Sequence, residues 1–196
     1  MNVVVFGEDI YTAAVTGSLI NCGHQVSLRI TPDNFNESHK VLEEAASRYN
    51  IEFIKDKNIN SEKIKDYLIK VKPDVIVAAH LRKILRKEIF SLAAKGAINI
   101  HPSLLPKYRG LSPQHQAILH GDNDSGVTVH YIDADVDTGE IIVQERFSVA
   151  ADDYIVHVQT KMLDIYKRIV VKALDLLADA TFKPAKQDLA DVSYFG

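Results

Sequence analysis

Asn99 and His101 lie two residues apart near the end of an apolar run, in the stretch AINIHPSLLPKYRG (residues 97–110). In a β-strand, residues i and i+2 point to the same face, so the two polar side chains are expected to project together. An amide donor beside a titratable imidazole can bind an oxyanion and exchange a proton. Pro102 then fixes the exit of the chain. Taken alone, the stretch is equally compatible with two polar residues satisfied by nearby backbone.

A second polar stretch, DADVDTGEI (residues 133–141), carries three aspartates ahead of Thr138 and Gly139. A carboxylate near an imidazole orients the ring and raises its pKa, which makes this stretch a candidate partner for the histidine. Asp and Gly are also preferred turn residues, and an ordinary acidic turn is the favoured interpretation for Asp133 and Asp135. A calcium site is not indicated, because the loop lacks the twelve-residue ligand pattern with its terminal Glu.

The remaining histidines receive structural interpretations first. His130, on a predicted strand, fits a place under the site and a hydrogen-bonded structural role equally well. His115 and His120 lack a third ligand at metal-binding spacing, and no metal site is expected. His80, at the end of a predicted strand, is a candidate supporting residue for a neighbouring binding segment.

Alternating strands and helices over the first hundred residues predict a parallel sheet built from right-handed crossovers. The helices are indicated by apolar residues at helical spacing, and the strands by short apolar, β-branched runs. The strands are expected at 2–6, 25–30, 51–54, 74–79 and 97–100, the helices at 10–21, 37–49, 61–71 and 86–95, and a turn at 31–34.

After residue 110 the pattern changes. A short helix is expected at 112–121, and two alternating stretches, 126–132 and 140–149, are typical of antiparallel strands. Apolar residues at three- and four-residue spacing predict a long amphipathic helix over 153–179. The fold class is therefore α/β: an open, mostly parallel, Rossmann-like sheet with helices on both faces, antiparallel strands in the C-terminal half and a long C-terminal helix. Residues 1–180 are expected to form one catalytic domain, and 181–196 an irregular tail.

Composition narrows the functional classes. The chain has 196 residues with a formal net charge of −3, which gives no general electrostatic attraction to nucleic acid. Cys22 is the only cysteine, so an intramolecular disulfide is excluded and a cytoplasmic setting is favoured. The N-terminus lacks the pattern of a signal peptide. An apolar run of membrane-spanning length is also absent, so a membrane partner is not expected.

The loop after the first strand lacks both glycine motifs of nucleotide-binding proteins. It reads GEDIYTAAVTG, with Gly7 alone and Glu8 and Asp9 where amides that bind phosphate would be needed. Two carboxylates at this position would repel a phosphate group. Binding of NAD or ATP at this loop is therefore disfavoured.

The two polar stretches together resemble the signatures of the folate-dependent formyltransferases. NIHPSLLPKYRG is similar to their Asn-x-His motif with its Ser-Leu-Leu-Pro loop, and DVDTGEII to their second motif, in which an Asp precedes a small residue and Gly. The separation of His101 and Asp137 also resembles that of the small glycinamide ribonucleotide enzymes. The resemblance extends over residues 1 to about 180.

The resemblance implies a donor, 10-formyltetrahydrofolate, an amine acceptor and no metal. It assigns catalysis to Asn99 and His101, which would stabilise the oxyanion, and to Asp137, which would keep His101 protonated and relay protons through water. Ser103 is then a loop-fixing residue. The pterin pocket would be lined by Leu81, Arg82, Lys83, Ile84, Leu85, Asp133, Ala134, Asp135 and Val136. From their charge, Lys107 and Arg109 are expected to meet an anionic acceptor, with Gly110 beside them, although PKYRG is equally compatible with a solvated basic turn.

The acceptor is expected to be a small amine, such as an amino sugar or a specialised metabolite. Glycinamide ribonucleotide enzymes hold the substrate phosphate in a Gly/Ser/Asn-rich loop, where this chain has GEDIYT. The first fifty residues look more like methionyl-tRNA and sugar formyltransferases, whose further C-terminal domain is not expected here, which disfavours tRNA. A formyltetrahydrofolate hydrolase would share the triad but usually has an extra N-terminal domain. Two alternatives stay open: a glycinamide ribonucleotide formyltransferase, and a non-catalytic folate- or nucleotide-binding protein. A homodimer also stays open.

Overall fold

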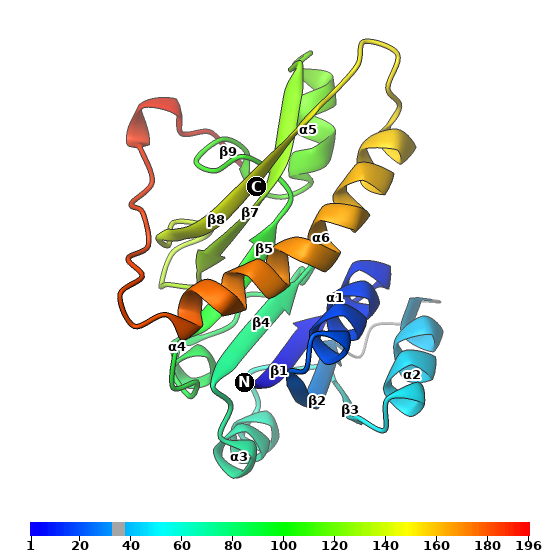
Figure 1. Cartoon of the computed structure of the whole chain (residues 1–196), viewed down its shortest axis with the longest axis vertical. Coiled ribbons are helices and arrows are strands. Elements are labelled where there is room, and N and C mark those ends of the chain that lie inside the picture. Colours follow the sequence, from blue (N-terminus) through cyan, green and yellow to red (C-terminus); the bar gives the residue numbers. More distant parts are fainter. Residues whose placement is uncertain (33–37) are drawn as a thin grey trace. The chain divides into compact units, whose positions relative to one another are not determined.

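The computed structural model describes residues 1–32 and 38–196. These residues form two compact units, Met1–Asn99 and Ile100–Gly196. Figure 1 shows the elements of each unit along the chain. The predicted class is confirmed: the chain is mixed α/β, with mostly parallel strands in the first unit, an antiparallel pair in the second and a long C-terminal helix.

The first unit is built on four parallel strands, β1 (Asn2–Gly7), β2 (Gln25–Pro32), β3 (Glu52–Asp56) and β4 (Val75–Ala79). β1 pairs with β2 on one side and β4 on the other, and β2 pairs with β3. The side chains of β1 and β4 are almost entirely excluded from water. Burial on both faces explains why these strands read as continuous apolar runs.

Three full helices accompany these strands: α1 (Ile10–Asn21), α2 (Ser38–Arg48) and α3 (Glu62–Val71). α1 begins at the capping residue Asp9, whose carboxylate accepts the N–H of Tyr11 at 3.0 Å. It ends at Cys22-Gly23, where Gly23 has a φ of 83°. The predicted bounds of α1 are confirmed. The predicted turn at 31–34 lies partly outside the described residues, and its first two residues belong to β2.

The predicted helix over 86–95 is wrong beyond its first turn. α4 covers only Lys87–Phe90 and is followed by turns up to Gly96. The N–H groups of Ala94 and Lys95 donate to the carbonyls of Pro73 and Asp74, at 3.1 and 2.7 Å. These long-range bonds replace the helical ones, so the helix-forming composition of the segment is overridden by its packing.

β5 (Ala97–His101) carries the chain from the first unit into the second. The second unit contains β6 (Arg109–Gly110), α5 (Pro113–Leu119), the antiparallel pair β7 (Asp124–Tyr131) and β8 (Ile141–Ser148), and α6 (Ile155–Ala178). α6 packs against β7 and β8 through its buried apolar stripe, as the spacing predicts.

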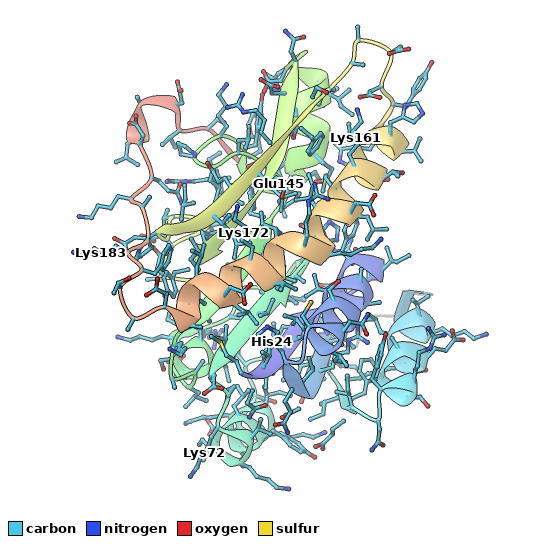
Figure 2. All side chains as sticks on the ribbon, viewed as in Figure 1. His24, Lys72, Glu145, Lys161, Lys172 and Lys183 are labelled. Atoms are coloured by element: carbon cyan, nitrogen blue, oxygen red, sulfur yellow. The ribbon has the colours of Figure 1, made fainter. Side chains whose placement is uncertain are left out.

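Polar contacts fix the position of α6 within this unit. The hydroxyl of Tyr166 donates to the carbonyl of Ile100 at 3.0 Å, which holds the middle of the helix to β5. Lys161 donates to the carbonyl of Ser148 at 3.0 Å, and Arg168 pairs with Glu145 on β8. Lys161 and Glu145 are labelled in Figure 2.

The last sixteen residues, expected to be irregular, return along the second unit. They contain a short 3-10 helix, η1 (Leu189–Asp191), and β9 (Tyr194–Phe195), which pairs in parallel with β6. Cys22 is free and exposed. Among the residues that the structure describes, we find no helix long and apolar enough to cross a membrane.

Candidate active site

His101 is the last residue of β5 and is buried, with 3% of its surface exposed. Its Nε2 lies 2.8 Å from the carbonyl oxygen of Tyr108. A carbonyl oxygen can only accept a hydrogen bond, so this nitrogen carries the proton and donates. The ring is therefore held from one side by the loop that follows β5.

That loop, residues 102–110, is fixed by a small network. The Ser103 hydroxyl donates to the carbonyl of Lys107 at 2.6 Å. The Thr128 hydroxyl on β7 donates to the carbonyl of Ser103 at 2.6 Å and accepts the N–H of Leu105 at 3.2 Å. The predicted loop-fixing contact of Ser103 is confirmed, and the loop holds the Tyr108 carbonyl against His101.

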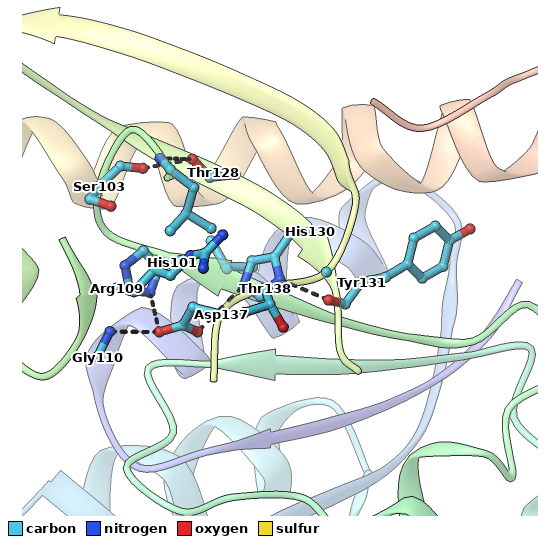
Figure 3. Close-up of polar contacts among 12 residues, drawn as sticks. His101, Ser103, Arg109, Gly110, Thr128, His130, Tyr131, Asp137 and Thr138 are labelled. Carbon is cyan, nitrogen blue, oxygen red and sulfur yellow. Dashed lines mark hydrogen bonds and ion pairs between the residues drawn. The ribbon is translucent and has the colours of Figure 1, made fainter. Parts of the chain in front are cut away.

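Asp137 lies between two histidines (Figure 3). Its Oδ2 is 3.4 Å from Nδ1 of His101, and its Oδ1 is 3.5 Å from Nε2 of His130. Oδ2 also accepts the main-chain N–H of Gly110 at 2.9 Å. The predicted closeness of His101 and Asp137 is confirmed, whereas their catalytic role stays a prediction.

The surroundings of Asp137 favour its charged form. Burial by itself raises the pKa of this carboxyl, but the His130 hydrogen bond, the charge of His101 and the N–H of Gly110 oppose burial and lower the pKa to about 2. Both ring nitrogens of His101 face oxygen acceptors, a carbonyl and a carboxylate. This geometry suits a doubly protonated imidazolium, which donates to both acceptors and carries a positive charge.

His130 belongs to this cluster but was not among the predicted site residues. It is 2% exposed, and its Nδ1 donates to the carbonyl of Tyr131 at 2.8 Å. The rings of His101 and His130 are 6.2 Å apart at their centroids and approach edge to face. The alternation of β7 could have found it, because Thr128 and His130 are two residues apart and share one strand face.

Asn99 lies at the predicted place on β5, two residues before His101, and is half-buried. The predicted donor-binding residues lie on two loops. Asp133, Ala134, Asp135 and Val136 are exposed in the loop before Asp137. The Asp133 carboxylate accepts the Thr138 hydroxyl at 2.7 Å, as expected of an acidic turn.

The segment Leu81–Leu85 follows β4 directly. Arg82, Lys83 and Ile84 are exposed, and Leu85 is buried. The carbonyl of Ile84 accepts the Asn60 side-chain amide at 3.0 Å. The segment is thus anchored near its end by Asn60, and three of its side chains are exposed.

Glu8 and Asp9 are tied to residues that follow β4. Glu8 is 2% exposed, and it accepts the main-chain N–H of Arg82 at 2.9 Å and the guanidinium of the same residue at 3.3 Å. The Asp9 carboxylate contacts Nδ1 of His80, whose ring packs against that of Tyr11 with centroids 4.9 Å apart and planes tilted by 34°. Burial and the charge of Asp9 raise the pKa of Tyr11 to about 12. Neither carboxylate is free in solvent.

The three predicted acceptor-binding residues have different surroundings. Lys107 is exposed. Arg109 is 9% exposed, and its Nε and Nη2 donate to Oε1 of Gln187 at 3.2 and 2.7 Å. Gly110 reaches Asp137 through its N–H. Among the described residues we find no cluster of His, Cys, Asp and Glu side chains able to hold a metal ion.

Comparison with known proteins identifies relatives of the whole chain. The formyl transferase family model matches residues 1–174. Methionyl-tRNA formyltransferase from Thermotoga maritima is 30% identical over 200 residues, which cover 99% of this chain and 64% of that protein. The chain thus spans less than two thirds of the length of this relative.

Two solved structures have a similar fold. The phosphoribosylglycinamide formyltransferase from Bacillus halodurans has a TM-score of 0.80 at 26% identity, with 93% of this chain and 99% of that chain covered. The N-formyltransferase from Helicobacter canadensis, in complex with folinic acid and dTDP-3-aminofucose, has a TM-score of 0.76 at 22% identity, with 98% and 70% covered.

Proposed function

Because the chain belongs to the formyl transferase family, we propose that it transfers a formyl group from 10-formyltetrahydrofolate to the amine of a small substrate. The observation that carries the proposal is the fixed position of His101 between the Tyr108 carbonyl and the Asp137 carboxylate. A buried imidazolium held in this way places a fixed positive charge that can stabilise a nearby oxyanion.

The proposed roles follow from this arrangement. Asn99 and His101 stabilise the negative charge that develops on the formyl oxygen when the amine attacks the formyl carbon. Asp137 keeps His101 protonated and passes a proton through water from the attacking nitrogen to the departing folate nitrogen. One C–N bond forms and one breaks, the proton moves between the two nitrogens, and no covalent enzyme intermediate is required.

The donor is proposed to bind along Leu81–Leu85 and residues 133–136. Main-chain groups of such loops can read the edge of a pterin ring, and exposed apolar side chains can pack on its face. Ile84 is 70% exposed and Val136 38% exposed, so each segment offers one apolar side chain to a ligand. The complex of one structural relative with folinic acid supports a folate as the donor.

The acceptor is proposed to be neutral or cationic at the end that meets the loop after β1. Glu8 and Asp9 lie in this loop, where Glu8 pairs with Arg82 and Asp9 contacts the ring of His80. An anionic acceptor would instead reach the exposed Lys107. An amino sugar or another small amine fits these surroundings better than a phosphorylated amine.

A screen of amines with 10-formyltetrahydrofolate tests the proposal, with release of tetrahydrofolate followed by absorbance. The wild type is expected to turn over at least one amine, and His101→Ala to lose about 10²–10⁴ of that turnover while binding of the folate changes little. Full turnover by His101→Ala on the same amine would contradict the assignment of His101. Folate binding without turnover of any amine would favour a non-catalytic binding protein.

A further inference from the structure

Gln187, in the C-terminal tail, joins two loops of the candidate site through its side-chain amide. Its Nε2 donates to the main-chain carbonyls of Asp137 and Gly139, at 2.9 and 2.8 Å. Its Oε1 accepts the two Arg109 hydrogen bonds. A carboxamide has two donor hydrogens and two acceptor lone pairs, so all four of its positions are used.

The hydrogen bonds of Gln187 lie at a residue with an unusual backbone conformation. Asp137 has a φ of 55°, in the left-handed region that residues with a side chain rarely adopt. Such a conformation persists only where surrounding contacts enforce it. Gln187 holds the carbonyl of Asp137 itself and that of Gly139, and therefore fixes the direction in which the Asp137 carboxylate leaves the chain.

Other tail residues hold the partner loop of His101. The Ser193 hydroxyl accepts the N–H of Tyr108 at 2.8 Å, and its carbonyl accepts the N–H of Arg109 at 2.9 Å. The carbonyl of Phe195 accepts the N–H of Leu111 at 2.6 Å. Because the Tyr108 carbonyl is the partner of His101, the tail supports both of the groups that orient this ring.

We propose that Gln187 is a positioning residue, which sets the orientation of Asp137 toward His101. It also joins the acidic loop (residues 133–139) to the loop that carries Arg109 (residues 102–110) by hydrogen bonds. The proposal rests on the proposed function. Gln187 does not touch the reacting atoms in this proposal; it acts through the main chain of Asp137 and the guanidinium of Arg109. Through Gln187 and Ser193, the tail beyond α6 then supports the groups that orient His101.

Two variants of the full chain distinguish the bonds of Gln187 to Arg109 from its bonds to Asp137 and Gly139. Gln187→Glu keeps an acceptor for Arg109 and removes both donors to the acidic loop. Gln187→Met is close in size and removes all four bonds. Lys186→Met is the matched control, because it places the same side chain at the exposed neighbouring position. All assays are run well below the unfolding midpoint of the least stable variant.

Two readouts are required. The kcat of Gln187→Glu is expected to fall by about 10²-fold with the acceptor KM changed less than threefold, since a misplacement of about 1 Å has an effect of this size. Gln187→Met, which adds no charge beside Asp137, should show a similar fall in kcat. In this variant the pKa of Asp137, followed by ¹³C NMR of its carboxyl carbon, is expected to rise from about 2 toward 3.8. Lys186→Met should show neither effect.

The outcomes distinguish the two proposals. Wild-type kcat and an unchanged Asp137 titration in both Gln187 variants would overturn the role of Gln187. A fall in kcat that accompanies thermal destabilisation alone, with Asp137 titrating as in the wild type, would also overturn it. A shifted Asp137 titration in a protein that formylates no amine would support the positioning role while rejecting the proposed function.

Discussion

Replacing Asp137 by Asn removes one negative charge from between His101 and His130 and keeps the size of the side chain. In the folded protein the pKa of this carboxyl is lowered from 3.8 to about 2, despite burial, by the two histidines and the N–H of Gly110. A shift of this size corresponds to about 2 kcal/mol of stabilisation of the native state. Asp137→Asn is therefore expected to lower the free energy of unfolding at pH 7 by about 2 kcal/mol.

The pH dependence of this loss has a definite sign. Because the folded pKa lies below the unfolded one, the stabilisation is fully present above the unfolded value of 3.8 and is lost as the pH falls through about 2. Roughly half of it should remain near pH 3, and little at pH 2. The difference between wild type and Asp137→Asn should therefore shrink as the solution is acidified.

Urea unfolding at pH 7, 5, 4 and 3 measures the difference, with Asp135→Asn as the control. Asp135 is an exposed residue of the same loop, and the same charge removal there should change the free energy of unfolding by less than about 0.5 kcal/mol. A difference for Asp137→Asn that stays constant from pH 7 to pH 3 would refute the reasoning. So would a loss no larger than that of the control.

Two further predictions follow from the geometry of the loops. Glycinamide ribonucleotide should be a poor acceptor, and a kcat/KM of about 10⁴ M⁻¹s⁻¹ or above, the ordinary enzyme range, would show that the loop after β1 accepts a phosphate. Gly139→Ala should destabilise the fold by more than about 2 kcal/mol in urea unfolding, because an added Cβ would lie 1.8 Å from the carbonyl oxygen of Tyr131. Gly121→Ala is its control. That position has space for a Cβ but a φ of 68°, so a loss of about 1 kcal/mol is expected there from the left-handed backbone alone. Equal losses at both positions would contradict the close approach at Gly139.

The alternation of elements could be predicted from the sequence because each carries its own local signal. α1 has its apolar spacing, its capping residue and its stop at Cys22-Gly23, and its bounds are as predicted. α4 shows the limit of such signals. Nothing in the composition of residues 91–95 shows that Ala94 and Lys95 bond to Pro73 and Asp74, over twenty residues earlier.

The candidate site divides in the same way. His101 and Asp137 could be predicted because their motifs are short and their surroundings in the sequence are distinctive, and the structure places them in contact. Gln187 could not, since a lone Gln in a polar tail carries no local pattern, and its partners lie 48 to 78 positions away. A residue that orients a catalytic group can come from any segment that the fold places beside it, whatever its distance in the sequence.

For the loop after β1, the structure gives a different physical reason for the predicted exclusion of phosphate. The sequence suggests exclusion of phosphate by repulsion from two carboxylates, yet Glu8 is paired with Arg82 and Asp9 with His80, which weakens their outward field. The stronger obstacle to phosphate is that the N–H groups at the start of α1 are already bonded. A helix N-terminus binds anions through its free N–H groups, and the Asp9 carboxylate already accepts those of Tyr11 and Thr12. A phosphate at α1 would have to displace a carboxylate that belongs to the chain and is held in place by His80, so the helix supplies its own anion and leaves an incoming acceptor to be recognised by other groups.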